Sequence, residues 1–311
     1  MKTISVVIPC HNEQDSLQPL FERLDGVFAK AAGYRFEVVC VNDGSVDRTL
    51  DILTGLAAER ADIVVVDLSR NFGKEAALSA GLKTASGDAV IPMDADLQDP
   101  PDLLIDMISK WEQGHEVVLA RRSDRSSDAL SKRWSARLFY RFHNQVADVT
   151  IPPDVGDFRL MDRVVVDVLN GLPESRRFMK GLFAWAGFRT VTIDYQRDPR
   201  AAGKSSFNGW RLWNLALEGI TSFSTAPLRI WTYLGVFVAA IAMLWAGWIT
   251  IRTLVYGVDV PGYASLFVAV LFLGGLQLIG IGVVGEYLGR TYIESKGRPA
   301  YVIRKIFRRD G

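Results

Sequence analysis

Two apolar segments, residues 233–255 and 263–287, constrain this chain more than any other feature of its sequence. Each is long enough to cross a hydrocarbon core of about 30 Å, which takes about 20 helical residues. Only residues 256–262 separate them, so the two segments predict a transmembrane hairpin. Two buried helices of a soluble core are the alternative, but no other part of the chain is large and apolar enough to cover them.

The charges around these segments predict how the hairpin lies in a membrane. Residues 256–262 contain no Lys or Arg. Basic residues flank the two segments on their other sides: Arg229, Arg290, Lys296, Arg298, Arg304, Lys305, Arg308 and Arg309. By the positive-inside rule, we expect a multi-pass protein of the cytoplasmic (inner) membrane with both termini in the cytoplasm. The expected division is a cytoplasmic N-terminal domain (1–204), interfacial juxtamembrane helices (205–231), the hairpin (232–288) and a basic cytoplasmic tail (289–311).

Short apolar runs alternate with helix-like segments in the first part of the chain. The runs are residues 4–8, 36–41, 63–68, 89–93 and 116–120. This alternation is typical of an α/β domain with a mostly parallel sheet and helices on both faces. No G-x-G-x-x-G follows a run, and Asp198 stands where a P-loop ending in Gly203-Lys204-Ser205 needs its first glycine. These absences argue against dinucleotide oxidoreductases and P-loop NTPases, and a formal net charge of +1 gives no indication of a nucleic-acid partner.

Polar side chains follow four of these runs. They are His11, Asn12 and Glu13, residues 42–45, residues 69–71, and the acidic group of Asp94, Asp96, Gln98 and Asp99. Ligands of open α/β sheets bind outside the carboxyl ends of the strands, so we expect a nucleotide-sized pocket there. Two plainer interpretations stay open. The acids also suit the cap of a helix led by Pro100 and Pro101, and residues 42–45 also suit a simple turn.

Any metal ion bound by this chain is expected to have oxygen ligands. Cys10, Cys40 and 3 His residues match no Cys/His zinc spacing, and each Cys closes an apolar run as a buried thiol would. Carboxylate and amide oxygens crowded at a strand end suit a hard divalent cation. Mg²⁺ or Mn²⁺ is therefore the expected ion.

Two further segments combine polar and apolar residues. Residues 119–144 are basic with interleaved aromatic residues, which favours a helix at the membrane surface or a phosphate clamp. A solvated, salt-bridged helix is the alternative for this segment. Residues 205–225 carry aromatic and aliphatic residues at helical spacing, which favours an interfacial helix beside the hairpin. A helix packed on the soluble domain is the alternative there.

An ordered set of short motifs runs through nearly the whole chain. It comprises residues 6–13 (VVIPCHNE), 41–45 (VNDGS), 71–74 (NFGK), 94–100 (DADLQDP), 156–159 (GDFR), 200–206 (RAAGKSS) and 285–290 (GEYLGR). Together with the hairpin, this set resembles glycosyltransferase family 2. It is most similar to the polyprenyl-phosphate glycosyltransferase branch, which includes dolichol-phosphate mannose synthases and bactoprenol glucosyltransferases. The resemblance implies a GT-A fold, a Rossmann-like α/β domain with a mostly parallel sheet.

The resemblance also implies a role for each matching residue. Those expected around the nucleoside of the donor are Pro9, Asn12, Glu13 and Asp43. Those expected at the reacting centre are Asp94 beside the donor sugar and diphosphate, Asp96 and Gln98 on the metal ion, and Asp157 near the acceptor. Those expected on the lipid phosphate or the donor diphosphate are Arg122, Arg133, Ser135, Arg200 and Lys204. Arg121, Arg125 and Lys132 are alternatives to Arg122 and Arg133.

The implied activity is inverting, metal-dependent transfer of a hexose from a nucleotide-diphosphate sugar, with UDP-glucose favoured. The implied acceptor is a polyprenyl phosphate, undecaprenyl or dolichyl, in the bilayer. The resemblance also suggests a homo-oligomer, with a tetramer as one form. Two rival functions are a processive polysaccharide synthase and a non-catalytic nucleotide-binding membrane scaffold. Leu130 replaces the Gln of the synthase motif Gln-x-x-Arg-Trp before Arg133, and the complete set of Asp94, Asp96 and Gln98 argues against the scaffold.

Overall fold

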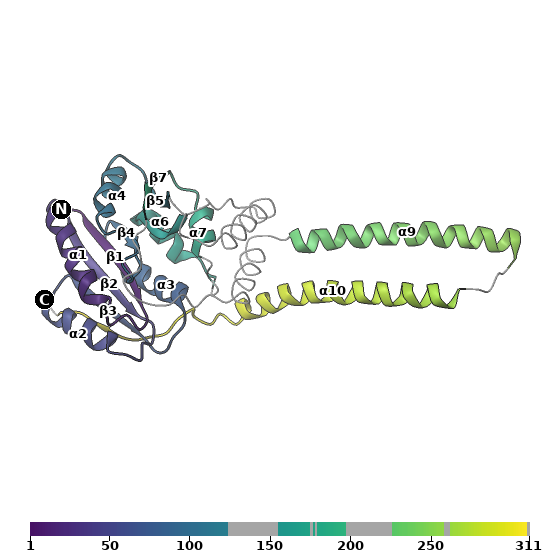
Figure 1. The fold of residues 1–311 in the computed structure, drawn as a ribbon, viewed down its shortest axis with the longest axis horizontal. Coiled ribbons are helices and arrows are strands. Elements are labelled where there is room, and N and C mark those ends of the chain that lie inside the picture. Colours follow the sequence, from purple (N-terminus) through teal and green to yellow (C-terminus); the bar gives the residue numbers. More distant parts are fainter. Residues whose placement is uncertain (124–154, 175–176, 178, 197–225, 258–261, 310–311) are drawn as a thin grey trace.

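The computed structural model describes residues 1–123, 155–174, 177, 179–196, 226–257 and 262–309 (Figure 1). The strands in this part of the chain are β1 (Thr3–Cys10), β2 (Arg35–Asn42), β3 (Ile63–Leu68), β4 (Ala89–Pro92), β5 (Val117–Arg122), β6 (Val155–Asp162), β7 (Thr190–Tyr195) and β8 (Ile303–Phe307). The helices are α1 (Leu17–Lys30), α2 (Thr49–Glu59), α3 (Lys74–Thr84), α4 (Leu103–Glu112), α6 (Arg163–Gly171), α7 (Met179–Trp185), α9 (Ala226–Tyr256) and α10 (Tyr263–Ser295).

The described strands form one mixed sheet in the order β7-β5-β6-β4-β1-β2-β3-β8. Strands β4, β1, β2 and β3 run parallel to one another, and β5 pairs in parallel with β7. Strand β6 is antiparallel to both β4 and β5, and β8 is antiparallel to β3. The predicted fold class, a mostly parallel α/β sheet with helices on both faces, is confirmed.

Two hydrophobic layers hold the sheet between its helices. Ile4, Val6 and Ile8 of β1 pack with the apolar faces of α1, α2 and α4 on one side. Val7 of the same strand packs with α3, α6 and α7 on the other side. Side chains of a strand alternate between its two faces, so a strand with both faces covered reads as a continuous apolar run. This is why the apolar runs of the sequence predicted the five strands β1 to β5.

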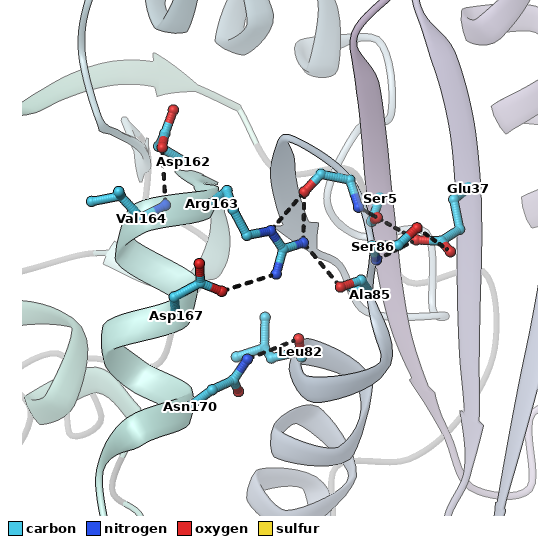
Figure 2. A network of polar contacts seen from close by, with 11 residues as sticks. Ser5, Glu37, Leu82, Ala85, Ser86, Asp162, Arg163, Val164, Asp167 and Asn170 are labelled. Carbon is cyan, nitrogen blue, oxygen red and sulfur yellow. Dashed lines mark hydrogen bonds and ion pairs between the residues drawn. The ribbon is translucent and has the colours of Figure 1, made fainter.

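A polar network fixes the turn between α3 and β4, at the edge of the sheet where β1 begins (Figure 2). Arg163, the first residue of α6, donates hydrogen bonds from Nη2 to the carbonyl oxygens of Ala85 (2.9 Å) and Gly87 (2.6 Å). The Glu37 carboxylate accepts hydrogen bonds from the Ser5 hydroxyl and from the Ser86 backbone N–H. The network therefore ties the entry of β4, which leads to the acidic motif, to β1, β2 and α6.

The two C-terminal helices run side by side away from the α/β domain (Figure 1). Among the described residues, Ile230–Tyr256 and Phe272–Ser295 are long and apolar enough to cross a membrane, with mean hydropathy of 2.1 and 1.4. Their apolar side chains are largely exposed, unlike those of the buried core helices considered as an alternative. A Cβ added at Gly280 of α10 would lie 1.8 Å from Trp231 Nε1, so a larger residue there would displace the Trp231 ring of α9.

Candidate active site

A cavity of about 290 Å³ opens at the carboxyl ends of the central parallel strands. It is lined by Pro9, Cys10, His11, Glu13, Asp43, Asn71, Gly73, Lys74, Ala77, Asp94, Ala95 and Asp96. These residues follow four neighbouring strands, β1 to β4, and all of those strands point their carboxyl ends at the same edge of the sheet. The structure thus brings Pro9, Glu13, Asp43, Asp94 and Asp96 of the predicted site into one cavity.

Asp43 anchors the loop between β3 and α3. Its Oδ1 accepts a hydrogen bond from the Phe72 backbone N–H (2.7 Å), and its Oδ2 accepts one from that of Gly73 (2.9 Å). A carboxylate oxygen has a second lone pair, so these bonds leave room for the predicted contact with a nucleoside. Asp43 is therefore both a wall of the cavity and the residue that fixes the start of α3.

The loops after β1 and β2 are joined to each other. Asn12 has a φ of 57°, its backbone N–H donates to Ser45 Oγ (3.1 Å), and its Oδ1 accepts from the Val46 N–H (2.9 Å). Asn12 is not among the described residues that line the cavity, although the sequence placed it around the nucleoside. The neighbouring residue His11 does line the cavity, and its Nδ1 lies 2.9 Å from the Asp43 carbonyl oxygen.

Gly44 allows the loop after β2 to approach the loop after β3. It has a φ of 63°, and a Cβ at this position would lie 2.4 Å from the backbone nitrogen of Asn71. Both its left-handed backbone and this close approach require glycine. The chain thus bends at Gly44 directly after β2, and Asp43 beside it lines the cavity.

The acidic motif divides between the cavity and the protein interior. Asp94 and Asp96 line the cavity, whereas Asp99 is buried and its Oδ1 accepts a hydrogen bond from the Tyr195 hydroxyl (2.5 Å). Burial and the nearby Asp99 raise the pKa of Tyr195 to about 12. The cap of α4 is Asp102, which makes no side-chain capping bond, so the described contacts do not support a capping role for the other acids.

Asp96 and Gln98 meet the first requirement of a site for a divalent cation. Asp96 Oδ1 accepts a hydrogen bond from the Gln98 backbone N–H (3.2 Å), and Leu97 between them has a φ of 58°. Gln98 is 8% exposed, and its Oε1 is buried with no hydrogen-bond partner among the described residues. A buried acceptor without a donor is unfavourable, and a cation would satisfy it. Asp96 lines the cavity, and Gln98 is not among the described residues that do. A carboxylate and an amide oxygen are ligand types that suit Mg²⁺ or Mn²⁺, and their joint role in a metal site stays a prediction.

Lys74 links the acidic motif to Asp157 on β6. Its Nζ lies 2.7 Å from Asp94 Oδ1 and 2.9 Å from Asp157 Oδ2. Burial opposes the charged ammonium, but Asp157 and Asp94 outweigh it and raise the pKa of Lys74 above its ordinary value. The sequence assigned no role to Lys74, although it follows a glycine at the same sheet edge as the predicted site residues.

Glu13 shares the negative field of this cavity. Burial, followed by the charges of Asp96 and Asp94, raises its pKa above the ordinary value. The backbone of Glu13 is held by the Thr49 hydroxyl, which accepts a hydrogen bond from the Glu13 N–H (2.8 Å). The clustered acids thus raise the free energy of the ionised carboxylates in the cavity. A bound cation would lower that free energy.

Two arginines lie on the β5 and β6 side of the site. Arg122 is the last residue of β5, and the positive charge of its side chain partly offsets the rise in the pKa of Tyr195. Arg159 is buried, donates from Nη2 to the Gly156 carbonyl oxygen (2.6 Å) and stacks over the Phe183 ring (4.0 Å). Burial lowers the pKa of Arg159 to about 10, so it stays charged at neutral pH. Arg159 was quoted within a motif but given no role.

Several predicted groups lie outside the described residues. They are Arg133, Ser135, Arg200 and Lys204, the greater part of the basic segment 119–144, and the interfacial segment 205–225. Their predicted roles therefore stay predictions.

The cavity at the carboxyl edge of a mixed α/β sheet, with paired acids after a central strand, is consistent with a GT-A glycosyltransferase. The model of glycosyl transferase family 2 matches residues 5–169, and that of the GtrB C-terminal hairpin matches residues 226–291. The chain belongs to glycosyl transferase family 2 and is an enzyme of that family.

Relatives match this chain from end to end. A protein of Shigella flexneri, named SfII prophage-derived bactoprenol glucosyl transferase, is 53% identical over 98% of this chain and 98% of its own length. A prophage bactoprenol glucosyl transferase homolog of Escherichia coli strain K12 is 50% identical over 97% of this chain and 99% of its own length.

A solved structure shares the fold at low identity. A mannosyltransferase from Pyrobaculum calidifontis, crystallised with GDP-Man and Mn²⁺, aligns with a TM-score of 0.50 and 18% identity over 94% of this chain and 86% of its own. The likeness supports the GT-A fold of the described domain.

Proposed function

We propose that this protein transfers glucose from UDP-glucose to a polyprenyl phosphate at the cytoplasmic face of a membrane, with inversion at the anomeric carbon. The observation that carries the proposal is the 53% identity, over 98% of both chains, to a bactoprenol glucosyl transferase. An acidic cavity and two candidate spans in the same chain support the proposal, because such a reaction needs a donor site in an enzyme attached to a membrane.

The donor side of the proposed site lies at the ends of β1, β2 and β4. Pro9, Glu13 and Asp43, with Asn12 in the adjoining loop, would surround the nucleoside. Asp94 would lie beside the sugar and diphosphate. Asp96 and Gln98 would hold Mg²⁺ or Mn²⁺, which when bound neutralises the charge that develops on the departing diphosphate. The chain's own contribution would be to hold both residues on one short loop, in which the Gln98 backbone N–H donates to Asp96 Oδ1.

The acceptor side of the proposed site includes Asp157, Arg122 and Lys74, with Arg133, Ser135, Arg200 and Lys204 from the residues not described. A phosphate monoester is already anionic at neutral pH, so it needs no strong general base to become a nucleophile. Asp157 would therefore position the acceptor rather than remove a proton. Arginine side chains match the geometry of phosphate oxygens because their donors form a planar fork.

The stereochemical proposal follows from a single displacement. A phosphate oxygen attacks the anomeric carbon from the face opposite the nucleotide diphosphate, the glycosidic bond to the diphosphate breaks, and the nucleoside diphosphate leaves. An α-linked donor then gives a β-linked lipid phosphate sugar. The structural requirement is that acceptor-side and donor-side groups meet in one place, and Lys74 contacts both Asp94 and Asp157.

The proposed membrane arrangement keeps the division made from the sequence. Residues 1–204 would form the cytoplasmic catalytic domain, and residues 205–231, which include the start of α9, would lie at the interface. The rest of α9, together with α10, would cross the bilayer. A polyprenyl phosphate keeps its tail among the lipids, so an anchored enzyme meets the phosphate at the membrane surface. We also propose that the protein forms a homo-oligomer in the membrane.

One assay tests the proposed function. Purified protein is incubated with undecaprenyl phosphate and Mg²⁺ or Mn²⁺, and each nucleotide sugar of a panel is added in a separate reaction. The masses of the lipid products are then measured by mass spectrometry. We expect one hexose to be added, and UDP-glucose to be the preferred donor. Release of free sugar without a lipid product would contradict the proposal, and so would a polymer longer than one sugar.

A further inference from the structure

Lys74 joins two carboxylates that come from different parts of the site. Its Nζ is 2.7 Å from Oδ1 and 2.9 Å from Oδ2 of Asp94, which follows β4. The same Nζ is 2.9 Å from Oδ2 of Asp157, which belongs to β6. Under the proposed function Asp94 serves the donor and Asp157 serves the acceptor. The ammonium therefore lies where the two substrates would meet.

The backbone of Lys74 is held in place by its neighbours. The two preceding residues, Phe72 and Gly73, donate their backbone N–H groups to the Asp43 carboxylate, and Gly73 has a φ of 96°. Lys74 is then the first residue of α3, whose apolar face is buried against the sheet. Because the backbone is fixed, the ammonium is directed into the cavity by a rigid support.

The ammonium has the capacity to bind an oxygen of a ligand. An ammonium has three N–H donors, and in this structure Nζ lies within 2.9 Å of three oxygens, both of Asp94 and Oδ2 of Asp157. The Lys74 side chain is 46% exposed and lines the cavity. An oxygen of a ligand in the cavity can therefore replace one of the two Asp94 contacts, and each carboxylate then still keeps one contact with the ammonium.

The charges around the cavity indicate which substrate needs this donor. Glu13, Asp43, Asp94, Asp96 and Asp157 are all acidic, so an anionic nucleophile approaching them is repelled. The proposed metal ion would serve the diphosphate of the donor. The acceptor phosphate, which is itself anionic, requires a cation beside Asp157, and Lys74 contacts that residue directly.

We propose that Lys74 binds the phosphate of the lipid acceptor and positions it for attack on the donor sugar. This inference rests on the proposed function. Lys74 keeps its ion pairs with Asp94 and Asp157 and donates its third N–H to one phosphate oxygen, which leaves another oxygen of the same phosphate to face the anomeric carbon. The preferred acceptor class is then a lipid phosphate monoester, because a neutral lipid alcohol would gain nothing from this contact.

The experiment compares Lys74→Met with Lys83→Met in the full-length protein. Lys83 lies on the same helix, is exposed and does not line the cavity, so it is the matched control. We expect Lys74→Met to raise the KM for undecaprenyl phosphate or lower kcat/KM for it by about 10-fold or more, as for loss of a charge-assisted hydrogen bond. The Kd for UDP-glucose, measured by calorimetry without acceptor, should change by less than about 3-fold. Lys74→Arg should recover part of the loss.

Two outcomes would overturn the inference. A loss of UDP-glucose binding in Lys74→Met, with an unchanged KM for the acceptor, would place the ammonium on the donor. Rescue of Lys74→Met by Asp157→Asn would show that Lys74 only neutralises Asp157. If the wild-type protein forms no lipid-linked sugar from any donor, the proposed function itself fails, which is distinct from a wild-type protein that is active and insensitive to Lys74→Met.

Discussion

Asp96 and Asp99 belong to one short acidic motif but have different surroundings. Asp96 lines the cavity, and Asp99 is buried against Tyr195. The left-handed backbone of Leu97, with a φ of 58°, lies between Asp96 and the rest of the motif. The sequence shows that three carboxylates are close together in the chain. It does not show that Leu97, between Asp96 and Asp99, has a left-handed backbone, because few non-glycine residues adopt that conformation.

Asp96→Ala tests the role of the cavity acid. We expect transfer of glucose to undecaprenyl phosphate to fall by about 100-fold or more, because an electrostatic contact to the departing diphosphate is lost. The measurement is the initial rate over a titration of Mg²⁺ and Mn²⁺. The apparent Tm should stay close to that of the wild type, because Asp96 lines the cavity and is not part of either hydrophobic layer.

Asp106→Ala is the matched control for that substitution. Asp106 is an exposed acid on α4, away from the cavity. Its removal should leave both the rate and the metal dependence unchanged. A wild-type metal dependence in Asp96→Ala would remove Asp96 from the proposed metal site.

Arg163→Ala separates stability from catalysis. Arg163 binds the carbonyl oxygens of Ala85 and Gly87 at the turn before β4 (Figure 2). Loss of these charge-assisted bonds should cost about 2 kcal/mol of unfolding free energy, which corresponds to a fall in apparent Tm of about 4–8 °C. The KM values should not change, because the network does not line the cavity. A lower Tm with altered KM values would show that the turn also shapes the site.

At the scale of elements, the sequence predicted the strands that are buried on both faces. Residues 63–68 were predicted as a strand and form β3. Strand β8 was not predicted, because Ile303–Phe307 contains Arg304 and Lys305 and reads as part of a basic tail. Only its pairing with β3 reveals it as a strand, and such a pairing joins residues more than two hundred positions apart in the chain. Long-range pairing of this kind leaves no local pattern in the sequence.

Removal of β8 should expose the edge of β3. A protein ending at Tyr301 loses the strand and the bond from Arg304 Nη2 to the Ser69 carbonyl oxygen (2.7 Å). Unpaired strand edges promote aggregation, so we expect a lower yield of monodisperse protein in size-exclusion chromatography and a lower Tm. A protein ending at Phe307 keeps the strand and serves as the control. Equal behaviour of the two truncations would contradict a stabilising role for β8.

The candidate site was predicted in part for the same physical reasons. Residues that follow parallel strands can be assigned to one edge of the sheet, which is how Asp43, Asp94 and Asp96 were selected. Lys74 and Arg159 received no role because their partners come from distant segments: Lys74 contacts Asp157, and Arg159 stacks on Phe183. These contacts depend on how β6 and α7 pack, and packing across layers cannot be read from spacing.

At the scale of the whole molecule, the hairpin and the α/β domain are joined at both ends of the hairpin. Helix α10 leads directly from the candidate span Phe272–Ser295 toward β8, which returns the chain to the sheet (Figure 1). The domain is therefore tied to the hairpin through the sheet itself. For a membrane enzyme, this connection would limit how far the cavity can move from the bilayer.

Cysteine labelling tests the proposed sidedness. We expect a membrane-impermeant maleimide to label Gly262→Cys, between the two helices, in intact spheroplasts. Val46→Cys, at a position 90% exposed on the domain, should be labelled only after lysis. The native protein is a suitable background because Cys10 and Cys40 are both buried. The reverse labelling pattern would contradict the positive-inside assignment.

The proposed function requires that donor and acceptor meet in one cavity and react by a single displacement. The most direct measurement is the anomeric configuration of the lipid product made from UDP-glucose and undecaprenyl phosphate, determined by NMR. A single displacement on an α-linked donor predicts a β-linked glucosyl phosphate. An α-linked product would contradict it.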